Sequence, residues 1–143
     1  MYSAGREWRI LEKQEDKILL ISQRTIGNRR FEANSNDRAN SEIRRYLSGE
    51  FYNSLSNDMQ SKIVEHSTGD KIFLLSIDEA RRYFSSDADR VALNLSGRAC
   101  WWWLRSRDSG YASYVYYRGN ILLNGYGVDE GSGGVRPALW LNL

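Results

Sequence analysis

The residue types that carry most catalytic and metal-binding chemistry are scarce in this sequence. Of its 143 residues, one is a cysteine, Cys100, and one is a histidine, His66. A single cysteine excludes an internal disulfide, and a zinc site or a serine–histidine–aspartate triad would have to use His66. That histidine lies in a polar segment, residues 61–69, without a nucleophile motif directed at it. We therefore expect His66 at the surface near a helix end, a buried thiol at Cys100, and no catalytic activity, metal or cofactor.

Strong charge and long apolar runs are also missing. The net charge is +2, with 20 basic and 18 acidic residues mixed along the chain, which is too weak a bias for a nucleic-acid-binding protein. No apolar run approaches the length of about 20 residues that a membrane-spanning helix needs. Residues 1–9 lack the apolar centre of a signal peptide. The sequence predicts no nucleic-acid partner and no membrane insertion, and nothing in it specifies an oligomeric state.

Apolar and aromatic side chains are abundant enough to form the core of one folded domain. Hydrophobic residues make up 41% of the chain and charged residues 27%, a balance typical of globular proteins. Aromatic residues reach 13%, with five Trp and nine Tyr, and such an excess fills a core, forms a binding face, or does both. Because the length suits a single domain and no repeat or linker is visible, we predict one domain over residues 1–143.

Strand and helix patterns are segregated along the first two thirds of the chain. Residues 7–12 and 17–22 indicate a β-hairpin. Apolar residues at helical spacing within residues 40–66 indicate two helices with serine or asparagine caps. An apolar run at residues 71–75 is typical of a buried strand, and a Ser-x-x-Glu capping box at residues 76–79 begins another short helix. This order predicts an α+β domain with two helices, a mainly antiparallel sheet and chain ends that lie near each other.

The last third of the chain has a different composition. Three consecutive tryptophans, residues 101–103, precede a stretch rich in Gly, Tyr, Ser and Asn over residues 107–134. The Arg-Gly-Asn sequence at residues 118–120 is suited to a turn, because glycine and asparagine tolerate positive φ. A second hairpin, with strands at residues 112–117 and 121–128, is therefore predicted.

The aromatic and aliphatic residues that border this stretch are interpreted as scaffold. Side chains of a strand alternate between its faces, so Trp101, Trp102 and Trp103 cannot all point to one core. Either Trp102 or the outer pair is predicted to be partly exposed. Pro137 cannot donate a hydrogen bond to a sheet, which places it at an edge or at the start of a strand. The other scaffold residues are Leu104, Leu139, Trp140 and Leu141.

Four arginines receive structural interpretations. Arg44 and Arg45 fall on the polar side of the first predicted helix, so we expect them to face solvent. Arg105 and Arg136 border the Gly- and Tyr-rich stretch. We expect these two to bind carboxylates or backbone carbonyls rather than a ligand.

Two motifs resemble a bacterial and phage domain family of unknown function that is common in gut bacteria. They are Trp-Trp-Leu-Arg-Ser at residues 102–106 and Gly-Val-Arg-Pro-Ala-Leu-Trp-Leu-Asn-Leu at residues 134–143. One departure is Arg107-Asp108, which stands where the family usually has Pro-Gly. Shorter upstream segments match in the same order, so the resemblance covers nearly the whole chain; they are residues 7–11, 41–44, 51–53, 73–76 and 87–90.

Some members of this family resemble target proteins of diversity-generating retroelements, in which an error-prone reverse transcriptase randomises the adenines of a copied repeat. The resemblance implies a C-type-lectin-like fold, related to that of formylglycine-generating enzymes. Residues 1–100 would be its scaffold half and residues 101–143 its variable, ligand-binding half. Asparagine codons randomised at both adenines cannot encode Lys, Glu, Gln, Met or Trp. Of these five types, residues 107–134 contain only Glu130.

The composition of the variable half also favours ligand binding. Tyrosine provides a large amphipathic contact area at low entropic cost, and Ser, Gly and Asn adapt their hydrogen bonds, as in antibody loops. The expected partner is a protein or glycan on a cell or phage surface, and we expect the domain there rather than in the cytoplasm. Val115, Ile121 and Val128 are predicted to be core anchors, and one of Leu122 and Leu123 is expected to be buried. The candidate ligand-binding residues are Arg107, Asp108, Ser109, Tyr111, Ser113, Tyr114, Tyr116, Tyr117, Arg118, Leu122, Leu123, Asn124, Tyr126, Asp129 and Ser132.

Four alternative functions have weaker support. Formylglycine-generating oxidases use paired cysteines, and this chain has one cysteine. Asn124, Asp129 and Glu130 could provide oxygen ligands to calcium, but the Glu-Pro-Asn and Trp-Asn-Asp signatures of sugar-binding lectins are missing. A glycosidase needs two carboxylates facing one cleft, whereas the adjacent Asp129 and Glu130 would face apart in a strand. The fourth alternative is an undiversified interaction or structural module of a larger surface or phage protein.

Overall fold

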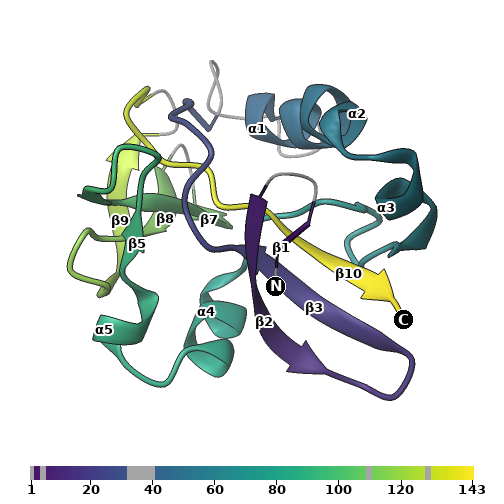
Figure 1. Ribbon diagram of the computed structural model, residues 1–143. Coiled ribbons are helices and arrows are strands. Elements are labelled where there is room, and N and C mark those ends of the chain that lie inside the picture. The colour runs from purple at the N-terminus through teal and green to yellow at the C-terminus, as the bar shows by residue number, and fades with distance from the viewer. Residues whose placement is uncertain (1, 4–5, 32–40, 109–110, 128–129) are drawn as a thin grey trace.

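A computed structural model describes residues 2–3, 6–31, 41–108, 111–127 and 130–143 of the chain. It is a mixed α+β domain with few, short helices and antiparallel sheets (Figure 1), which confirms the predicted class. The strands are β1 (Tyr2–Ser3), β2 (Arg6–Lys13), β3 (Lys17–Ser22), β4 (Ile63–Val64), β5 (Ala92–Leu93), β6 (Ala99–Cys100), β7 (Trp102–Asp108), β8 (Tyr111–Val115), β9 (Ile121–Gly127) and β10 (Ala138–Asn142). The helical segments are α1 (Glu42–Tyr46), the π-type turn η1 (Leu47–Phe51), α2 (Tyr52–Ser54), α3 (Asn57–Lys62), α4 (Ile77–Tyr83) and α5 (Asp87–Arg90).

The largest sheet joins the two ends of the sequence. Its strand order is β1-β2-β3-β10-β4, so β10 lies between β3 and β4. Strands β3 and β10 are antiparallel, with Leu20 opposite Leu139, and the backbone N–H of Leu143 donates to the carbonyl of Asp16 at 2.9 Å. The predicted hairpin of β2 and β3 is confirmed, as is the proximity of the two ends. Strand β10 begins immediately after Pro137, where a residue without an N–H is tolerated.

The helices between residues 41 and 62 form as their capping and apolar residues predict. The Ser41 hydroxyl accepts the N–H of Arg44 at 3.2 Å, and the Ser56 hydroxyl accepts the N–H of Met59 at 3.1 Å. Segments α1, η1 and α2 run without a break from residue 42 to residue 54, and α3 follows. The π-type turn and the short helix α5 were not predicted, whereas the capping box that begins α4 is confirmed.

The strand predicted at residues 71–75 does not form. Only Phe73 makes a β-bridge, to Ala138, through N–H to carbonyl hydrogen bonds of 3.0 and 2.8 Å. The side chains from Ile72 to Leu75 are all buried. The apolar run therefore indicates that this segment lies in the core, not that it pairs with another strand. A short apolar run does not distinguish an extended buried segment from a strand.

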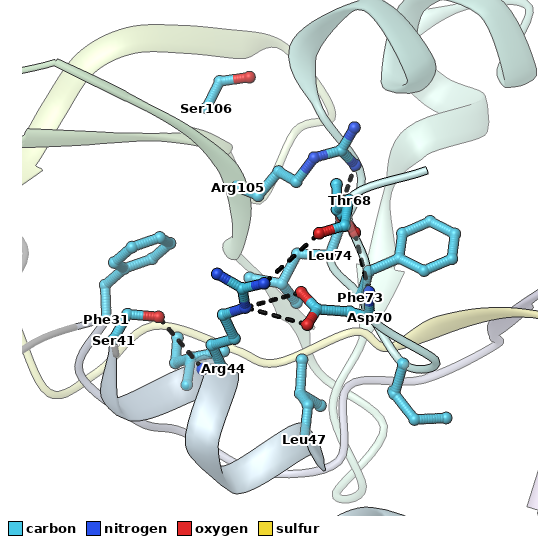
Figure 2. Close-up of a pocket in the computed structure, with 12 residues that line it drawn as sticks. Phe31, Ser41, Arg44, Leu47, Thr68, Asp70, Phe73, Leu74, Arg105 and Ser106 are labelled. Atoms are coloured by element: carbon cyan, nitrogen blue, oxygen red, sulfur yellow. Dashed lines mark hydrogen bonds and ion pairs between the residues drawn. The ribbon is translucent and has the colours of Figure 1, made fainter. Parts of the chain in front are cut away.

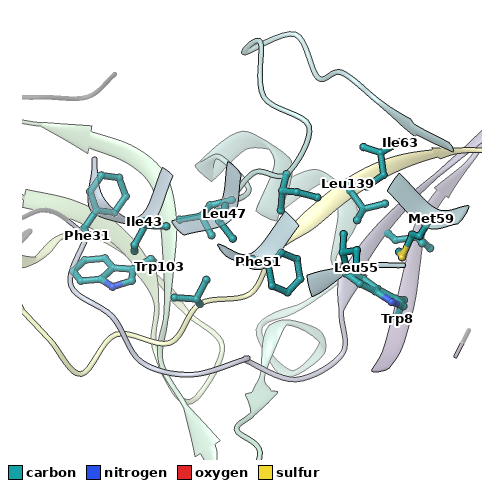
Figure 3. Packing of buried hydrophobic residues seen from close by; sticks show 14 of the residues in the cluster. Trp8, Phe31, Ile43, Leu47, Phe51, Leu55, Met59, Ile63, Trp103 and Leu139 are labelled. Atoms are coloured by element: carbon teal, nitrogen blue, oxygen red, sulfur yellow. The ribbon is translucent and has the colours of Figure 1, made fainter. Parts of the chain in front are cut away.

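Strand β7 is buried on both of its faces. Trp103 belongs to a core cluster in which its ring lies 5.7 Å from that of Phe31, and the cluster extends through Leu47 and Phe51 to Trp8 (Figure 3). Trp102 belongs to a second cluster, where its ring meets Phe84 at 6.2 Å. Both indoles are fully buried and Trp101 is half-buried. The prediction that either Trp102 or the outer pair is partly exposed holds for Trp101 but is wrong for Trp103, because it assumed that a core lies on only one side of the strand.

Arg136 links the largest sheet to the second core cluster. Its side chain is 1% exposed. Its Nε donates to the carbonyl of Ser22 at 2.7 Å and its Nη2 to the carbonyl of Gln23 at 3.2 Å, while its guanidinium lies 4.9 Å from the Trp102 ring centroid. Burial lowers the pKa of Arg136 to about 10, because a buried cation loses its hydration. The expected structural role of this arginine is confirmed.

Replacement of Trp103 should test whether the first core cluster depends on β7. Trp103→Ala leaves a large cavity in a closely packed core, so the free energy of unfolding should fall by about 3–5 kcal/mol. Leu95→Ala is the control, because Leu95 is 69% exposed and should cost less than about 0.5 kcal/mol. Urea denaturation followed by circular dichroism measures both. Similar losses in the two variants would contradict the position of Trp103 in the core.

Candidate functional site

The β8–β9 hairpin forms as predicted and belongs to a three-stranded sheet with β7. Val115 lies opposite Ile121 next to the turn. The turn is closed by the N–H of Tyr116, which donates to the carbonyl of Asn120 at 2.8 Å, and by the N–H of Gly119, which donates back to the carbonyl of Tyr116 at 2.8 Å. Gly119 has a φ of +93°, which glycine adopts without the penalty that other residues meet.

Helix α5 fixes the turn end of this hairpin. Arg90 is buried and its Nε donates to the carbonyl of Gly119 at 2.8 Å, while its Nη2 pairs with the Asp87 carboxylate. A Cβ atom added to Gly119 would overlap the backbone carbonyl of Asp87. The turn therefore combines a conformation that favours glycine with an approach that only glycine permits.

Several predicted binding residues do lie on the surface of this region. Tyr111 and Leu123 are each 51% exposed, and Tyr117 is 38% exposed. Tyr116 is half-buried, with its ring 4.4 Å from that of Tyr117. Leu122 packs partly against the first core cluster, so the two leucines face apart as their alternation predicts. Two predicted polar residues, Arg118 and Ser132, are also exposed.

Two predicted binding residues are buried and need correction. Ser113 is 3% exposed and its hydroxyl donates to the carbonyl of Leu123 at 3.0 Å. Tyr114 is 5% exposed and packs edge-to-face on Trp101 at 5.1 Å. Burial on both faces of β8 removes these side chains from contact with a ligand. Val115 is buried and Ile121 packs against the second core cluster, as expected of anchors.

The structure does not describe the side chains of the remaining residues that were predicted to bind ligand or to anchor the hairpin. The backbones of four of them lie in β7 and β9, and the structure describes nothing of their side chains; these are Arg107, Asp108, Asn124 and Tyr126. Three further positions lie outside the described residues, and these are Ser109, Val128 and Asp129.

A cavity of about 480 Å³ lies between α1, the 68–74 segment and β7 (Figure 2), and sequence reasoning did not find it. Its apolar lining includes Phe31, Ile43 and Leu47, which are buried. Arg44, predicted to face solvent, is half-buried and its Nε pairs with the Asp70 carboxylate at 2.8 Å. The polar lining residues are Ser41, Arg44, Thr68, Asp70, Arg105 and Ser106. The sequence gives only a weak indication of this cavity, because Arg44 and Asp70 are distant along the chain and nothing in the sequence pairs them.

A network of charged groups borders this cavity. His66 stacks on Phe73 at 3.9 Å and its Nε2 lies 3.2 Å from the Glu79 carboxylate. Only 8% of the His66 side chain is exposed, so the prediction of a surface residue at a helix end was wrong. The other carboxylate oxygen of Glu79 accepts the N–H of Ser76 at 2.8 Å and pairs with Arg105. Burial raises the pKa of Glu79, but the hydrogen bonds from Ser76 and Arg105 outweigh it and hold the pKa below its ordinary value.

The scarce metal-binding residue types do not cluster in the described structure. Cys100 is half-buried rather than fully buried; burial raises the pKa of its thiol, which lies 3.4 Å from the Thr25 hydroxyl. Among the described residues, no three His, Cys, Asp or Glu side chains are grouped so that they could hold a metal ion. None of the helices in the described ranges is long and apolar enough to cross a membrane.

The low pKa of Glu79 predicts sensitivity to acid. A carboxyl group whose pKa is lower in the folded state stabilises the fold above its unfolded pKa of about 4.3, and this contribution is lost as the pH falls through the folded pKa. From about pH 5 to about pH 2, the wild type should therefore lose more unfolding free energy than Glu79→Gln, by on the order of 1 kcal/mol. Urea melts at each pH measure the difference. Glu50→Gln, at a carboxylate that is 77% exposed, should behave like the wild type, and an equal response of all three proteins would contradict the prediction.

Gly119 should tolerate no side chain. Gly119→Ala forces a β-carbon against the Asp87 carbonyl and a non-glycine residue into positive φ, so stability should fall by about 2 kcal/mol or more. Gly131→Ala is the matched control, since no atom lies within 4 Å of its added Cβ, and it should change stability by less than about 0.5 kcal/mol. Thermal melts of both variants check the contrast. If Gly119→Ala melted like the wild type, the turn would not be held against α5.

Comparison with known proteins assigns the chain to a family. No curated protein and no solved structure matches the sequence. The family described as "Domain of unknown function (DUF6273)" matches residues 15–143. These residues include every element from β3 to β10, with the hairpin and the cavity. The chain therefore belongs to the DUF6273 family.

Proposed function

We propose that this protein is a non-catalytic recognition domain with a C-type-lectin-like fold, and that the β8–β9 hairpin carries its ligand-binding surface. The ligand is a protein or glycan on a cell or phage surface, where we also expect the domain to act. The paired β3 and β10 strands, the helices between them and the separate β7–β9 sheet support the choice of fold. An experimental structure that superposes poorly on C-type lectin domains would contradict that part of the proposal.

The observation that carries the proposal is the distribution of exposed apolar surface. The described chain leaves seven large hydrophobic side chains exposed, and three of them lie in this hairpin: Tyr111, Tyr117 and Leu123. On β8 itself, Ala112 belongs to the first core cluster and Val115 to the second, and both are fully buried. Exposed aromatic groups on a rigid support are typical of a recognition surface, because little conformational entropy is lost when they bind.

The dimensions of the hairpin suit a macromolecular ligand. Tyr111 begins β8 and Tyr117 lies in the turn that follows it, so the two residues lie toward opposite ends of a strand about 15 Å long. A protein interface of ordinary size covers about 800 Å² per partner, which spans this distance. Tyrosine and arginine often provide most of the binding energy at such interfaces, and the hairpin turn also exposes Arg118.

Diversification of this region is the second part of the proposal. Residues 107–134 contain only one residue type that randomised asparagine codons cannot encode, at Glu130. We propose that a diversity-generating retroelement varies the codons of exposed hairpin residues. Sequencing the DNA around the gene tests this directly, because it should show a reverse transcriptase gene and an adenine-rich near-repeat of the 3′ end. A locus without both would contradict diversification and leave the binding proposal in place.

One observation favours a fixed interaction module of a larger surface or phage protein. Ser113 and Tyr114 lie within the stretch and are buried, and random replacement at buried positions usually destabilises a protein. A near-repeat whose adenines avoid the codons of these two residues would support diversification. A locus without such a near-repeat would favour the fixed module.

A triple variant tests the binding surface. Tyr111→Ala, Tyr117→Ala and Leu123→Ala together remove the exposed apolar groups of the hairpin, so binding to a glycan array and to a panel of bacterial cells should be abolished. Stability should change by no more than about 1 kcal/mol because all three side chains are exposed. Flow cytometry and array fluorescence measure binding, and a urea melt verifies the fold.

The control removes exposed apolar groups elsewhere. Leu93→Ala, Leu95→Ala and Leu143→Ala lie outside the hairpin and are comparably exposed, so this triple variant should bind like the wild type. A complementary experiment exchanges residues 107–132 between this protein and a relative with a different partner. Partner choice that followed residues 1–100 would contradict the proposal.

A further inference from the structure

We propose that the cavity beside α1 binds a small molecule that consists of a carboxylate and an apolar body, such as an aliphatic or arylacetic acid. The site is separate from the exposed hairpin residues and does not depend on the proposed recognition function. Its walls come from α1, from the segment that follows β4 and from β7. Pockets of 300–1,000 Å³ are the usual size of small-molecule sites, and this cavity of about 480 Å³ is toward the lower end.

One wall of the cavity is suited to the apolar body of the ligand. Ile43, Leu47 and Ile72 are at most 2% exposed, and Phe31 and Phe73 add ring surface. Aliphatic groups and rings together form the kind of lining that most small-molecule sites use for affinity, with a few polar groups that fix orientation.

The polar part of the site depends on Arg105. The carbonyl and carboxylate partners expected of this residue are confirmed, and the proposal adds a ligand contact that the sequence did not predict. Nη1 of Arg105 donates to the carbonyl of Leu74 at 2.8 Å and also pairs with Glu79. Its guanidinium lies 5.9 Å from the Phe73 ring centroid. Within the described part of the chain, Nε and Nη2 of Arg105 have no hydrogen-bond partner.

Those two nitrogens share one edge of the guanidinium, which binds both oxygens of a carboxylate side by side. Because Nη1 already anchors the group, this edge would bind a ligand with little loss of side-chain freedom. Ser106, the next residue of β7, also lines the cavity (Figure 2). Its hydroxyl oxygen accepts the N–H of Ile77 at 3.0 Å, so its hydroxyl proton remains able to donate.

The surrounding charges permit a carboxylate to enter. The Asp70 carboxylate in the lining is paired with Arg44 at 2.8 Å, and Glu79 is paired with Arg105 and lies beside His66. A carboxylate ligand therefore meets no unpaired acid among the described residues around the cavity. An inorganic anion would leave the apolar wall unused, and a neutral apolar molecule would leave the free edge of Arg105 unpaired. Only a ligand that has both a carboxylate and an apolar body pairs with the free edge of Arg105 and also contacts the apolar wall.

Nuclear magnetic resonance titration of the ¹⁵N-labelled full chain tests the site. The probes are phenylacetate and hexanoate, with phenylacetamide as the uncharged counterpart and acetate as the anion without an apolar body. We expect saturating amide shifts at Thr68, Leu74 and Ser106 with at least one of the two acids. Phenylacetamide and acetate should bind about tenfold more weakly or worse, because each lacks one of the two recognised parts.

Arg105→Lys provides the decisive variant. It retains a positive charge that can reach Glu79 but removes the free guanidinium edge, so acid binding should weaken about tenfold or more. Arg82→Lys is the matched control, because Arg82 is on α4 with its side chain 70% exposed, and it should bind like the wild type. If Arg105→Lys does not fold, the wild-type shift map and the comparison with phenylacetamide decide the question.

Three results would overturn the proposal: no saturating shift with either acid, equal binding of phenylacetate and phenylacetamide, or shifts confined to the β8–β9 hairpin. The hairpin triple variant separates the two proposals. It should lose binding to cells and glycans while its affinity for the carboxylate remains that of the wild type.

Discussion

The burial of β7 on both faces is the constraint on which the rest of the structure depends. Trp103 fills the core beneath the first helices, and Trp102 fills the core beside α4 and α5. A strand that packs on both sides cannot rotate or slip by one residue, because a slip would exchange the two indoles between cores of different shape. This fixed strand positions the β8–β9 hairpin on one edge and Arg105 at the cavity. Both candidate sites thus derive their geometry from the same two side chains.

Local signals in the sequence predicted most of the fold. Capping residues such as Ser41 and Ser56 specify helix starts through hydrogen bonds within a few residues, and the Gly-Asn turn at Gly119 specifies the second hairpin in the same way. The structural role of Arg136 was predicted from its place in the closing motif that borders the Gly- and Tyr-rich stretch, and its hydrogen bonds to backbone carbonyls confirm it. These features depend on spacing along the chain, which the sequence displays directly.

The incorrect predictions share a different cause, since they required knowledge of what lies across the domain. Tyr114 has the sequence neighbourhood of a binding loop, yet Trp101 and the first core cover it. His66 follows a helix in a polar segment, yet Phe73 and Glu79 enclose its ring. The cavity combines Arg44, Asp70 and Arg105 from three distant segments, and no single window of sequence contains that combination. Burial by distant segments is a tertiary property, and the pattern of residues in a short stretch of sequence predicts it poorly.

The position of β10 affects how the chain is made and checked. This strand follows the hairpin in the sequence but lies in the middle of the largest sheet, between β3 and β4. A nascent chain on the ribosome therefore cannot close that sheet until β10 has emerged, however early β2 and β3 pair. A frameshift or stop codon anywhere in residues 107–132 would remove β10 and expose the edges of both neighbouring strands, and unpaired strand edges favour aggregation. Only copies that include β10 would therefore complete the sheet and accumulate as folded protein.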